Sequence, residues 1–197
     1  MRPRNENKEL AVRQKALELI VKEGFDGLSM HKLAKAAGVS AATIYIYYQD
    51  REDLILQLCE EENQKMTEAT LAGFDPDMHF DEGLKVQWLN RAKYCLENPL
   101  SMHFLEQIKY SPLHEKVRAR MDPRFHEAMR RFVSNAIQRQ ELVPLPIEIY
   151  WSMAFAPMYQ LVKFHMSKAG MPGRGDFVLD EAKLNQALAL VLKALKP

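Results

Sequence analysis

Apolar residues recur at intervals of three and four along most of the chain, which is the spacing of one face of an α-helix. Within residues 8–23, for example, Leu10, Leu17 and Ile20 fall on a single helical face. No segment shows the sustained alternation of apolar and polar residues that is typical of a half-buried strand. The pattern therefore predicts an all-α protein.

Glycines, prolines and capping residues divide this pattern into separate helices. Ser29, Ser40 and Asp50 each precede an apolar run and are good N-caps, and Asp53 completes a carboxylate version of the capping box at Asp50. Pro157 lies inside the longest apolar run and is expected to kink it. The expected helices span about residues 8–23, 30–37, 40–47, 50–72, 81–97, two segments between 99 and 140 with breaks near 111–112 and 122–123, 146–169 and 180–196.

Charge is distributed unevenly, although the net charge of the 197 residues is only +1. Residues 1–48 carry 8 Lys/Arg against 5 Asp/Glu, residues 49–82 carry 2 against 11, and residues 83–197 carry 17 against 10. A basic head that contacts DNA and an acidic connector to a larger body would give this distribution, and so would three solvated faces without a binding role. We expect a head over residues 1–49 and a larger helical domain over residues 50–197.

Several function classes lack the sequence features that they require. The charge-free apolar stretch 149–162 is too short to span a bilayer, and the polar N-terminus contains no signal peptide, so no membrane partner is expected. Only two cysteines are present, Cys59 and Cys95, which suits a reducing cytoplasm; they are expected to be buried, although oxidant sensing stays open. Motifs for serine hydrolases, P-loops and zinc proteases are absent, and the histidines lack ligand spacing, so we expect no enzyme, cofactor or metal.

Residues 29–48 have the spacing of a helix-turn-helix. Ala34 and Ala37 are small enough for two helices to cross closely, and Gly38 tolerates the positive φ that a sharp turn needs. Apolar side chains then fill the inside of the corner: Leu33, Val39, Ile44 and Tyr48. In a DNA-binding helix-turn-helix the second helix enters the major groove, whereas a generic helical hairpin would show the same corner without that role.

The wider stretch Ala16–Leu58 resembles the DNA-binding head of the TetR family of transcriptional regulators. The matching residues are Glu23-Gly24-Phe25, Gly27-Leu28-Ser29, Leu33-Ala34, Ala37-Gly38-Val39-Ser40, Thr43-Ile44-Tyr45, Tyr47-Tyr48, Asp50-Arg51-Glu52 and Leu54. The rest of the chain is similar to that family only in its succession of helices.

The resemblance implies which side chains contact double-stranded DNA. Thr43 and Tyr45 would hold backbone phosphates, together with Arg51 from the start of the following helix. Such contacts set the register of the protein on the duplex and do not select a base sequence. The positions implied for base contacts are His31, Ala41, Ala42 and Tyr47.

The sequence departs from many family members at two of these positions. Ala41 and Ala42 can contact thymine methyl groups but have no donor or acceptor for base edges. Direct base contacts then depend on Tyr47 and His31, unless His31 is an ordinary surface residue, and DNA shape adds to the selection. A candidate N-terminal arm contains Arg2, Arg4 and Lys8.

The three tyrosines within one helical turn cannot all be buried. We expect Tyr48 to be buried and Tyr45 and Tyr47 to be exposed.

The last expected helix, residues 180–196, carries more apolar surface than one neighbouring helix can cover. The resemblance implies a homodimer through a four-helix bundle of the last two long helices. Two-fold symmetry would then match a pseudo-palindromic operator. A packed monomer core would use the same residues. The candidate interface residues are Leu184, Leu188, Val191 and Leu195.

Aromatic and methionine side chains accumulate in the middle helices and in residues 146–169. They could line a cavity for a small apolar or aromatic molecule, because methionine adapts to varied ligands, or they could form an ordinary core. The candidates are Trp88, Met102, Phe104, Tyr110, Met121, Trp151, Phe155, Met158 and Tyr159.

Together these features predict a homodimeric, ligand-responsive, DNA-binding transcriptional regulator. The resemblance implies a repressor that a small-molecule effector releases, because DNA and effector favour different spacings of the two heads. An activator would have the same sequence features. An alternative from another class is an all-α small-molecule binding protein, or an enzyme, whose N-terminal hairpin is purely structural.

Overall fold

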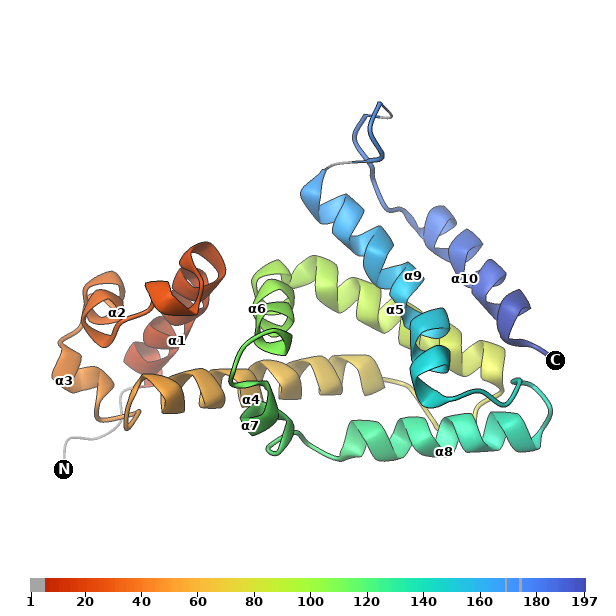
Figure 1. Cartoon of the computed structure of the whole chain (residues 1–197), viewed down its shortest axis with the longest axis horizontal. Helices are drawn as coiled ribbons and strands as arrows, with labels where there is room; N and C mark the ends of the chain where they lie inside the picture. Colours follow the sequence, from red (N-terminus) through yellow and green to blue (C-terminus); the bar gives the residue numbers. More distant parts are fainter. Residues whose placement is uncertain (1–5, 169, 174) are drawn as a thin grey trace. The chain divides into compact units, whose positions relative to one another are not determined.

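The computed structural model describes residues 6–168, 170–173 and 175–197, and in these residues all regular structure is helical (Figure 1). This confirms the predicted all-α class. The chain forms two compact units, of which the first contains residues 6–65 and 98–122. The second contains residues 66–97 and the described part of 123–197. These units are defined by packing, and the functional division after residue 49 stays a prediction.

The first unit combines the N-terminal head with helices from the middle of the chain. Its α1 packs against both α2 and α6, and the ring of the fully buried Phe104 in α6 lies 6.4 Å from the ring of Phe25. The core of the head is therefore completed by residues that follow it by more than forty positions. The elements are α1 (Glu6–Glu23), the 3₁₀ helix η1 (Phe25–Gly27), α2 (Met30–Ala37), α3 (Ala41–Ile44), the first part of α4 (Arg51–Leu71), α6 (Pro99–Lys109) and α7 (His114–Arg118).

The second unit contains the long apolar helices. Its α5 packs against α8 and α9, and α10 packs against α9. Close approach of α5 to α8 requires Gly83, since a Cβ there would lie 2.4 Å from the ring of Phe132. The elements are the end of α4, α5 (Phe80–Glu97), α8 (Arg124–Gln138), α9 (Ile147–Ser167) and α10 (Glu181–Leu195). In the described part of the chain, no helix combines the length and apolar character that crossing a membrane requires.

Local capping signals place most helix ends where the sequence predicts them. Ser29 accepts from the Lys32 N–H at 3.2 Å, and Asp53 at the start of α4 accepts from the Gln49 N–H at 2.8 Å. The third helix is the exception, because α3 ends at Ile44 and residues 45–47 form a turn. The apolar helix α9 continues through Pro157 and changes direction part-way along its length in Figure 1. Its predicted last residue, Ala169, lies outside the described residues.

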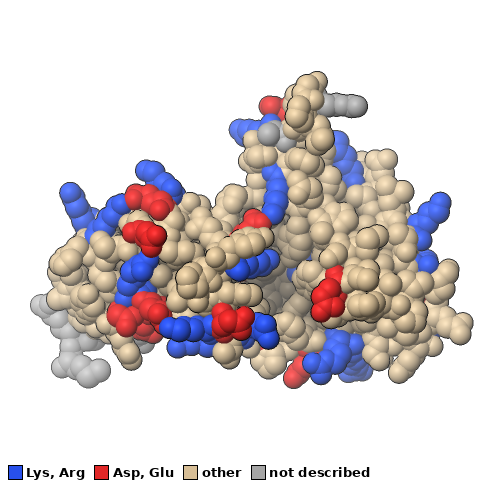
Figure 2. Space-filling view, viewed as in Figure 1, with Lys and Arg blue, Asp and Glu red and all other residues tan. Residues whose placement is uncertain are grey.

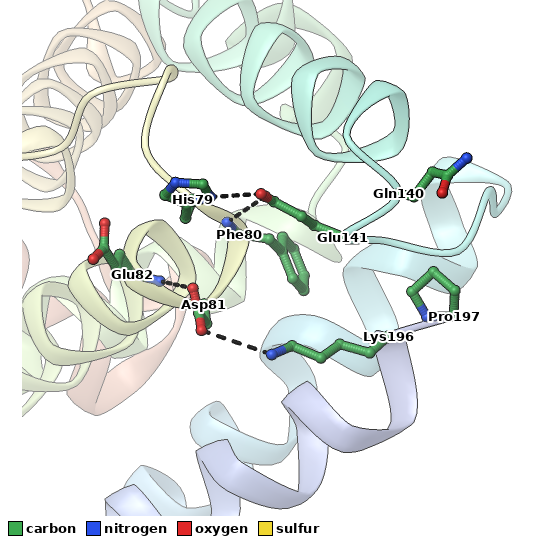
Figure 3. A pocket seen from close by; sticks show the side chains of 8 residues that line it. All are labelled: His79, Phe80, Asp81, Glu82, Gln140, Glu141, Lys196 and Pro197. Carbon is green, nitrogen blue, oxygen red and sulfur yellow. Dashed lines mark hydrogen bonds and ion pairs between the residues drawn. The ribbon is translucent and has the colours of Figure 1, made fainter.

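Glu141 connects the loop after α8 to the first turn of α5 (Figure 3). Its carboxylate accepts from the Phe80 N–H at 2.9 Å, lies 2.6 Å from His79 Nδ1 and pairs with Arg139 Nε at 3.3 Å. Burial raises the pKa of Glu141, but the hydrogen bonds from His79 and Phe80 and the charge of Arg139 together outweigh it and lower the pKa. The ionised carboxylate therefore stabilises the second unit.

The substitution Glu141→Gln should destabilise the protein at neutral pH by about 1 kcal/mol, the net contribution of a typical hydrogen bond. A carboxyl group with a lowered folded-state pKa stabilises the protein above its unfolded pKa, and this contribution is lost as pH falls through the folded pKa. The difference in urea-unfolding free energy between wild type and Glu141→Gln should therefore shrink between pH 7 and about pH 3. The exposed carboxylate Glu148, changed to Gln, is the control, and an equal difference at both pH values would contradict the assignment.

Both cysteines are buried inside helices, and neither forms a disulfide within the described residues. Cys59 in α4 is fully buried, and Cys95 in α5 is 1% exposed. Burial raises the pKa of Cys59 to about 12, although the Asn63 amide donates to its Sγ at 3.2 Å. Because the thiolate is the reactive species, such a thiol is chemically quiet at neutral pH.

Native protein should react with an aromatic disulfide reagent at pH 8 at least about a hundredfold more slowly than urea-unfolded protein, since the thiolate of Cys59 is disfavoured and shielded. The rate is read from the absorbance of the released thiol, and Cys59→Ala and Cys95→Ala assign the two phases. Rapid modification of native Cys59 would show that this thiol is accessible to oxidants.

Candidate nucleic-acid interface

The corner between α2 and α3 has the geometry that the sequence predicts. Gly38 adopts φ 66° and ψ 31°, a left-handed conformation that ends α2, and the Val39 N–H donates to the Ala34 carbonyl at 3.0 Å. Ser40 then caps α3, accepting from the Thr43 N–H at 3.1 Å. Ile44 is completely buried beneath the turn. A helix of only four residues is thus held at both ends by side-chain and backbone contacts.

One edge of this corner is open to solvent. Tyr45 is 54% exposed and Ile46 is 53% exposed, and His31 and Ala42 are also exposed. Thr43 and Ala41 are half-buried. The Thr43 hydroxyl lies 2.9 Å from the Ser40 hydroxyl, so it takes part in the cap of α3. Ile46 is a surface residue that the sequence analysis did not single out.

The expectation that Tyr47 is exposed is wrong. Tyr47 is 8% exposed and its ring lies 6.3 Å from the ring of Tyr48, which is buried as predicted. Both follow Ile44 by three and four positions, so all three fall on the inward face of the turn. Base contact by Tyr47 would need a change in this packing.

Arg51 at the start of α4 is directed toward the head itself. Its Nη2 donates to the carbonyl of Phe25 in η1, and its Nε is buried without a hydrogen-bond partner among the described residues. The guanidinium therefore connects α4 to η1. Its phosphate contact stays a prediction.

Arg13 in α1 is a residue that sequence analysis missed. Its Nε donates to the Tyr48 hydroxyl at 3.0 Å, its Nη2 to Glu9 at 2.9 Å, and its Nη1 pairs with Glu61 of α4. Arg13 therefore holds the end of the helix-turn-helix against both α1 and α4. No local motif marks the contacts with Tyr48 and Glu61, because these two partners lie 35 and 48 positions away.

Acidic and basic side chains lie next to one another on the first unit in the face shown in Figure 2. Ion pairs join Lys32 to Glu23, Lys116 to Glu52 and Arg120 to Glu60. Part of the positive charge of the first unit is therefore already neutralised within that unit, including the charge of Lys32 in the head. Of the predicted arm, Arg2 and Arg4 lie outside the described residues, and Lys8 is exposed on α1.

The predicted effector residues do not belong to one unit. Met102, Phe104, Tyr110 and Met121 lie in the first unit, and the other five lie in the second. Tyr110 is 85% exposed and cannot line an enclosed cavity, which corrects its assignment. Phe104 is fully buried in the core of the head, next to Phe25.

In the second unit, three of the remaining aromatic candidates, Trp151, Phe155 and Tyr159, contact a cation that sequence analysis missed. Arg91 of α5 is 2% exposed, and its guanidinium carbon lies 4.6 Å from the Phe155 ring and 5.3 Å from the Trp151 ring. Its Nη1 donates to the Tyr159 hydroxyl at 2.9 Å. Trp88 and Met158 are fully buried, and the Trp88 indole donates to the Ala154 carbonyl at 2.7 Å.

A separate surface pocket of about 540 Å³ opens near the C-terminal end of the second unit (Figure 3). None of the nine predicted effector residues lines it. Its lining residues are His79, Phe80, Asp81, Glu82, Gln140, Glu141, Lys196 and Pro197. Among residues 6–168, 170–173 and 175–197, no three histidine, cysteine or acidic side chains converge to hold a metal ion.

The predicted dimer stripe faces the interior of its own unit. This face of α10 packs against α9 and α5 of the same chain. Its residues are therefore only 1% to 7% exposed: Leu184, Leu188, Val191 and Leu195. These residues are therefore corrected to core positions. The apolar residues exposed on the last two helices are instead Ile147, Ile149, Trp151, Met153 and Leu190.

Comparison with known proteins agrees with this geometry. Residues 13–58 match the family model described as bacterial regulatory proteins, tetR family. The chain is 33% identical over 94 residues to an uncharacterized HTH-type transcriptional regulator of Haemophilus influenzae, over 48% of this chain and 50% of that protein. It is 39% identical over 46 residues to the fatty acid metabolism regulator protein of Bacillus subtilis, over 23% of this chain and 24% of that protein.

These curated relatives are matched over half of their own length or less. A solved structure extends the likeness to the whole chain. A TetR family transcription regulator from Marinobacter aquaeolei VT8 is 26% identical and superposes with a TM-score of 0.76, over 100% of this chain and 99% of that one. The head matches in sequence, and the complete succession of helices matches in structure. The head of the chain therefore matches the TetR family of bacterial regulatory proteins, and the chain as a whole shares the helical fold of a solved TetR family transcription regulator.

Proposed function

We propose that this protein is a homodimeric, ligand-responsive transcriptional regulator that binds DNA in the cytoplasm. The observation that carries the proposal is the exposed edge of the corner at Tyr45 and Ile46, within a segment that matches the family's N-terminal model. The competing hypothesis of an enzyme with a structural hairpin is disfavoured by the likeness of the head to the TetR family model and of the whole chain to a solved transcription regulator. A purely structural hairpin would also have no reason to expose Tyr45.

In this proposal α3 enters the major groove and its neighbours contact the phosphates. Thr43 and Tyr45 donate from their hydroxyls to phosphate oxygens, which positions the head without selecting a sequence. His31, Ala41, Ala42 and the exposed Ile46 face the bases. Apolar groups at three of these four positions favour contacts with thymine methyl groups. Tyr47 acts indirectly, by supporting Ile44 and Tyr48 beneath α3.

The effector is proposed to bind the second unit and to reduce the affinity for DNA, which makes the protein a repressor of a pseudo-palindromic operator. Three covalent links can carry the effect, because α4 crosses the division after Lys65, α6 follows α5 directly, and the chain returns to the second unit between Asp122 and Pro123. The name of the Bacillus subtilis relative refers to fatty acid metabolism, but that match covers 46 residues. It therefore supports the head and assigns no effector to this chain.

Dimerisation is proposed through the apolar side chains that α9 and α10 leave exposed. Ile149 and Met153 are four positions apart on α9, at 48% and 43% exposed, and Leu190 of α10 is 65% exposed. Such a set costs free energy in water and would be covered by the same helices of a second copy. Two-fold symmetry would then present two heads to one operator.

The substitution Tyr45→Phe should weaken binding to every DNA sequence by about tenfold, or ~1.4 kcal/mol, because it removes one hydrogen bond to a charged phosphate. Fluorescence anisotropy with the DNA upstream of the coding sequence and with a scrambled duplex measures both affinities. Tyr110→Phe, which removes the hydroxyl of an exposed tyrosine outside the head, is the matched control. If the affinity of Tyr45→Phe for both duplexes were unchanged, the proposed phosphate contact of Tyr45 would be wrong.

The substitution Leu190→Glu should convert the dimer into monomers at micromolar concentration, because it places a charge where α10 is proposed to meet its symmetry mate. Light scattering after size-exclusion chromatography measures the mass. Leu10→Glu, which changes a leucine 63% exposed on α1, should leave the dimer intact. A monomeric wild type would contradict the proposed dimer, and a dimeric Leu190→Glu would place the interface elsewhere.

A further inference from the structure

Arg91 is a buried cation with no acidic partner. It lies on α5, 2% exposed, and no carboxylate of the described residues, which include every Asp and Glu of the chain, pairs with it. Its hydrogen bonds go to neutral groups, with Nη1 donating to the Tyr159 hydroxyl at 2.9 Å and Nη2 to the Gln87 amide oxygen at 3.2 Å. A buried charge is normally paired, so the unit carries an unbalanced positive charge in its interior.

Aromatic rings enclose the guanidinium without neutralising it. Its central carbon lies 4.6 Å from the Phe155 ring, 4.8 Å from the Phe125 ring and 5.3 Å from the Trp151 ring. Cation–π contacts recover part of the lost hydration, but their energy is smaller than the cost of burying an unpaired charge. Since a neutral side chain of similar length would pack against the same rings, packing alone does not explain an arginine here.

Two buried polar atoms next to the same ring lack hydrogen-bond partners in the part of the chain that the structure describes. Arg91 Nε and the Tyr150 hydroxyl are both buried and unpaired, and the Tyr150 side chain packs edge-on to Phe155 with centroids 6.3 Å apart. Tyr150 itself is 1% exposed. Burial raises the pKa of Tyr150 by more than the charge of Arg91 lowers it, so the net shift is upward. This hydroxyl therefore stays protonated at neutral pH and can donate. Donors that face no acceptor among the described residues indicate that an acceptor comes from outside them.

We propose that Arg91 binds the carboxylate of a small hydrophobic acid, with Tyr150 as a second donor and the rings of Phe125, Trp151 and Phe155 around its apolar body. The single uncompensated cation matches a monoanion, whereas a phosphate dianion would leave negative charge unpaired. A guanidinium presents parallel N–H groups that suit the two oxygens of a carboxylate. This inference rests on the proposed effector function and specifies its ligand class.

Trp151 provides the route and the optical signal. It is 37% exposed, while its ring lies 4.7 Å from the Phe155 ring and 6.1 Å from the Phe125 ring. It is therefore the most exposed of the three rings around Arg91, since Phe125 is half-buried and Phe155 fully buried, and its displacement opens a path to Arg91. A ligand that enters beside it changes the environment of the indole.

The direct test follows the Nε–H resonance of Arg91 in protein labelled with ¹⁵N-arginine, assigned by its absence from Arg91→Met. Sodium 4-phenylbutyrate and sodium octanoate serve as carboxylate probes, 4-phenylbutan-1-ol and octan-1-ol as neutral matches, and inorganic phosphate as the other anion. We expect at least one carboxylate to shift this resonance saturably, and neither alcohol nor phosphate to do so. No shift with either carboxylate, or an equal shift with phosphate, would overturn the assignment.

Tryptophan fluorescence then gives affinities for the variants. Arg91→Met should weaken carboxylate binding by at least about tenfold, with little effect on the alcohol, and should unfold in urea at the same or a higher midpoint because it removes an unpaired buried charge. Lys85→Met, which removes an exposed cation from the same helix, should change neither quantity. Unchanged carboxylate affinity in Arg91→Met, with a lowered unfolding midpoint, would show that Arg91 only holds the core and would overturn the proposal.

If Arg91→Met does not fold, Arg91→Lys replaces it in the same titrations. Its ammonium keeps the charge but lacks the two parallel donors, so carboxylate binding should still weaken, and wild-type affinity would contradict the proposal. DNA binding is measured separately by anisotropy. A wild type that binds the carboxylate but no DNA would refute the regulator and leave the site standing. A wild type that binds DNA, but whose Arg91 resonance is shifted by neither carboxylate, would refute the proposed site and leave the regulator standing.

Discussion

The guanidinium of Arg13 determines where the short helix α3 can lie. It joins α1, the hydroxyl of Tyr48 just beyond α3, and Glu61 of α4. Because α3 has four residues, its own hydrogen bonds cannot fix its orientation, and both of its ends must be anchored. Ser40 anchors one end and Tyr48 the other. The exposed edge at Tyr45 is therefore a consequence of contacts made below it, so the proposed DNA interface depends on the packing of the whole first unit.

Sequence was sufficient for the features that depend on neighbouring residues. Gly38, Ser29 and Ser40 act within three or four positions, through a left-handed turn and two N-caps, and each is found where it was predicted. Tyr47 shows where local reasoning failed. It was expected on the surface, although it follows the buried Ile44 by three positions, and that spacing places it on the inward face. The signal was present in the pattern, but three adjacent tyrosines obscured it.

Features that depend on distant residues could not be predicted. The stripe from Leu184 to Leu195 was correctly recognised as a face that must be buried, but amphipathic spacing does not identify the partner. In the structure α9 and α5 of the same chain cover it. The candidate effector residues fail in the same way, since Phe104 belongs to the head and Tyr110 to the surface, while Trp151 and Phe155 meet around Arg91. An arginine within an amphipathic helix gives no indication that aromatic rings will enclose it.

The position of Arg91 connects the proposed ligand to the proposed dimer. Its guanidinium touches Phe125 at the start of α8 and Trp151 and Phe155 in α9. The same α9 exposes Ile149 and Met153, the residues proposed to meet a second copy. An anion that orders the rings around Arg91 would therefore act on the helix that sets the geometry between subunits. By linkage, any such effect on DNA affinity must be matched by an equal effect of DNA on the affinity for the anion. A buried charge without a partner destabilises the core of the unit. A bound anion that pairs with Arg91 would explain why an arginine occupies this position.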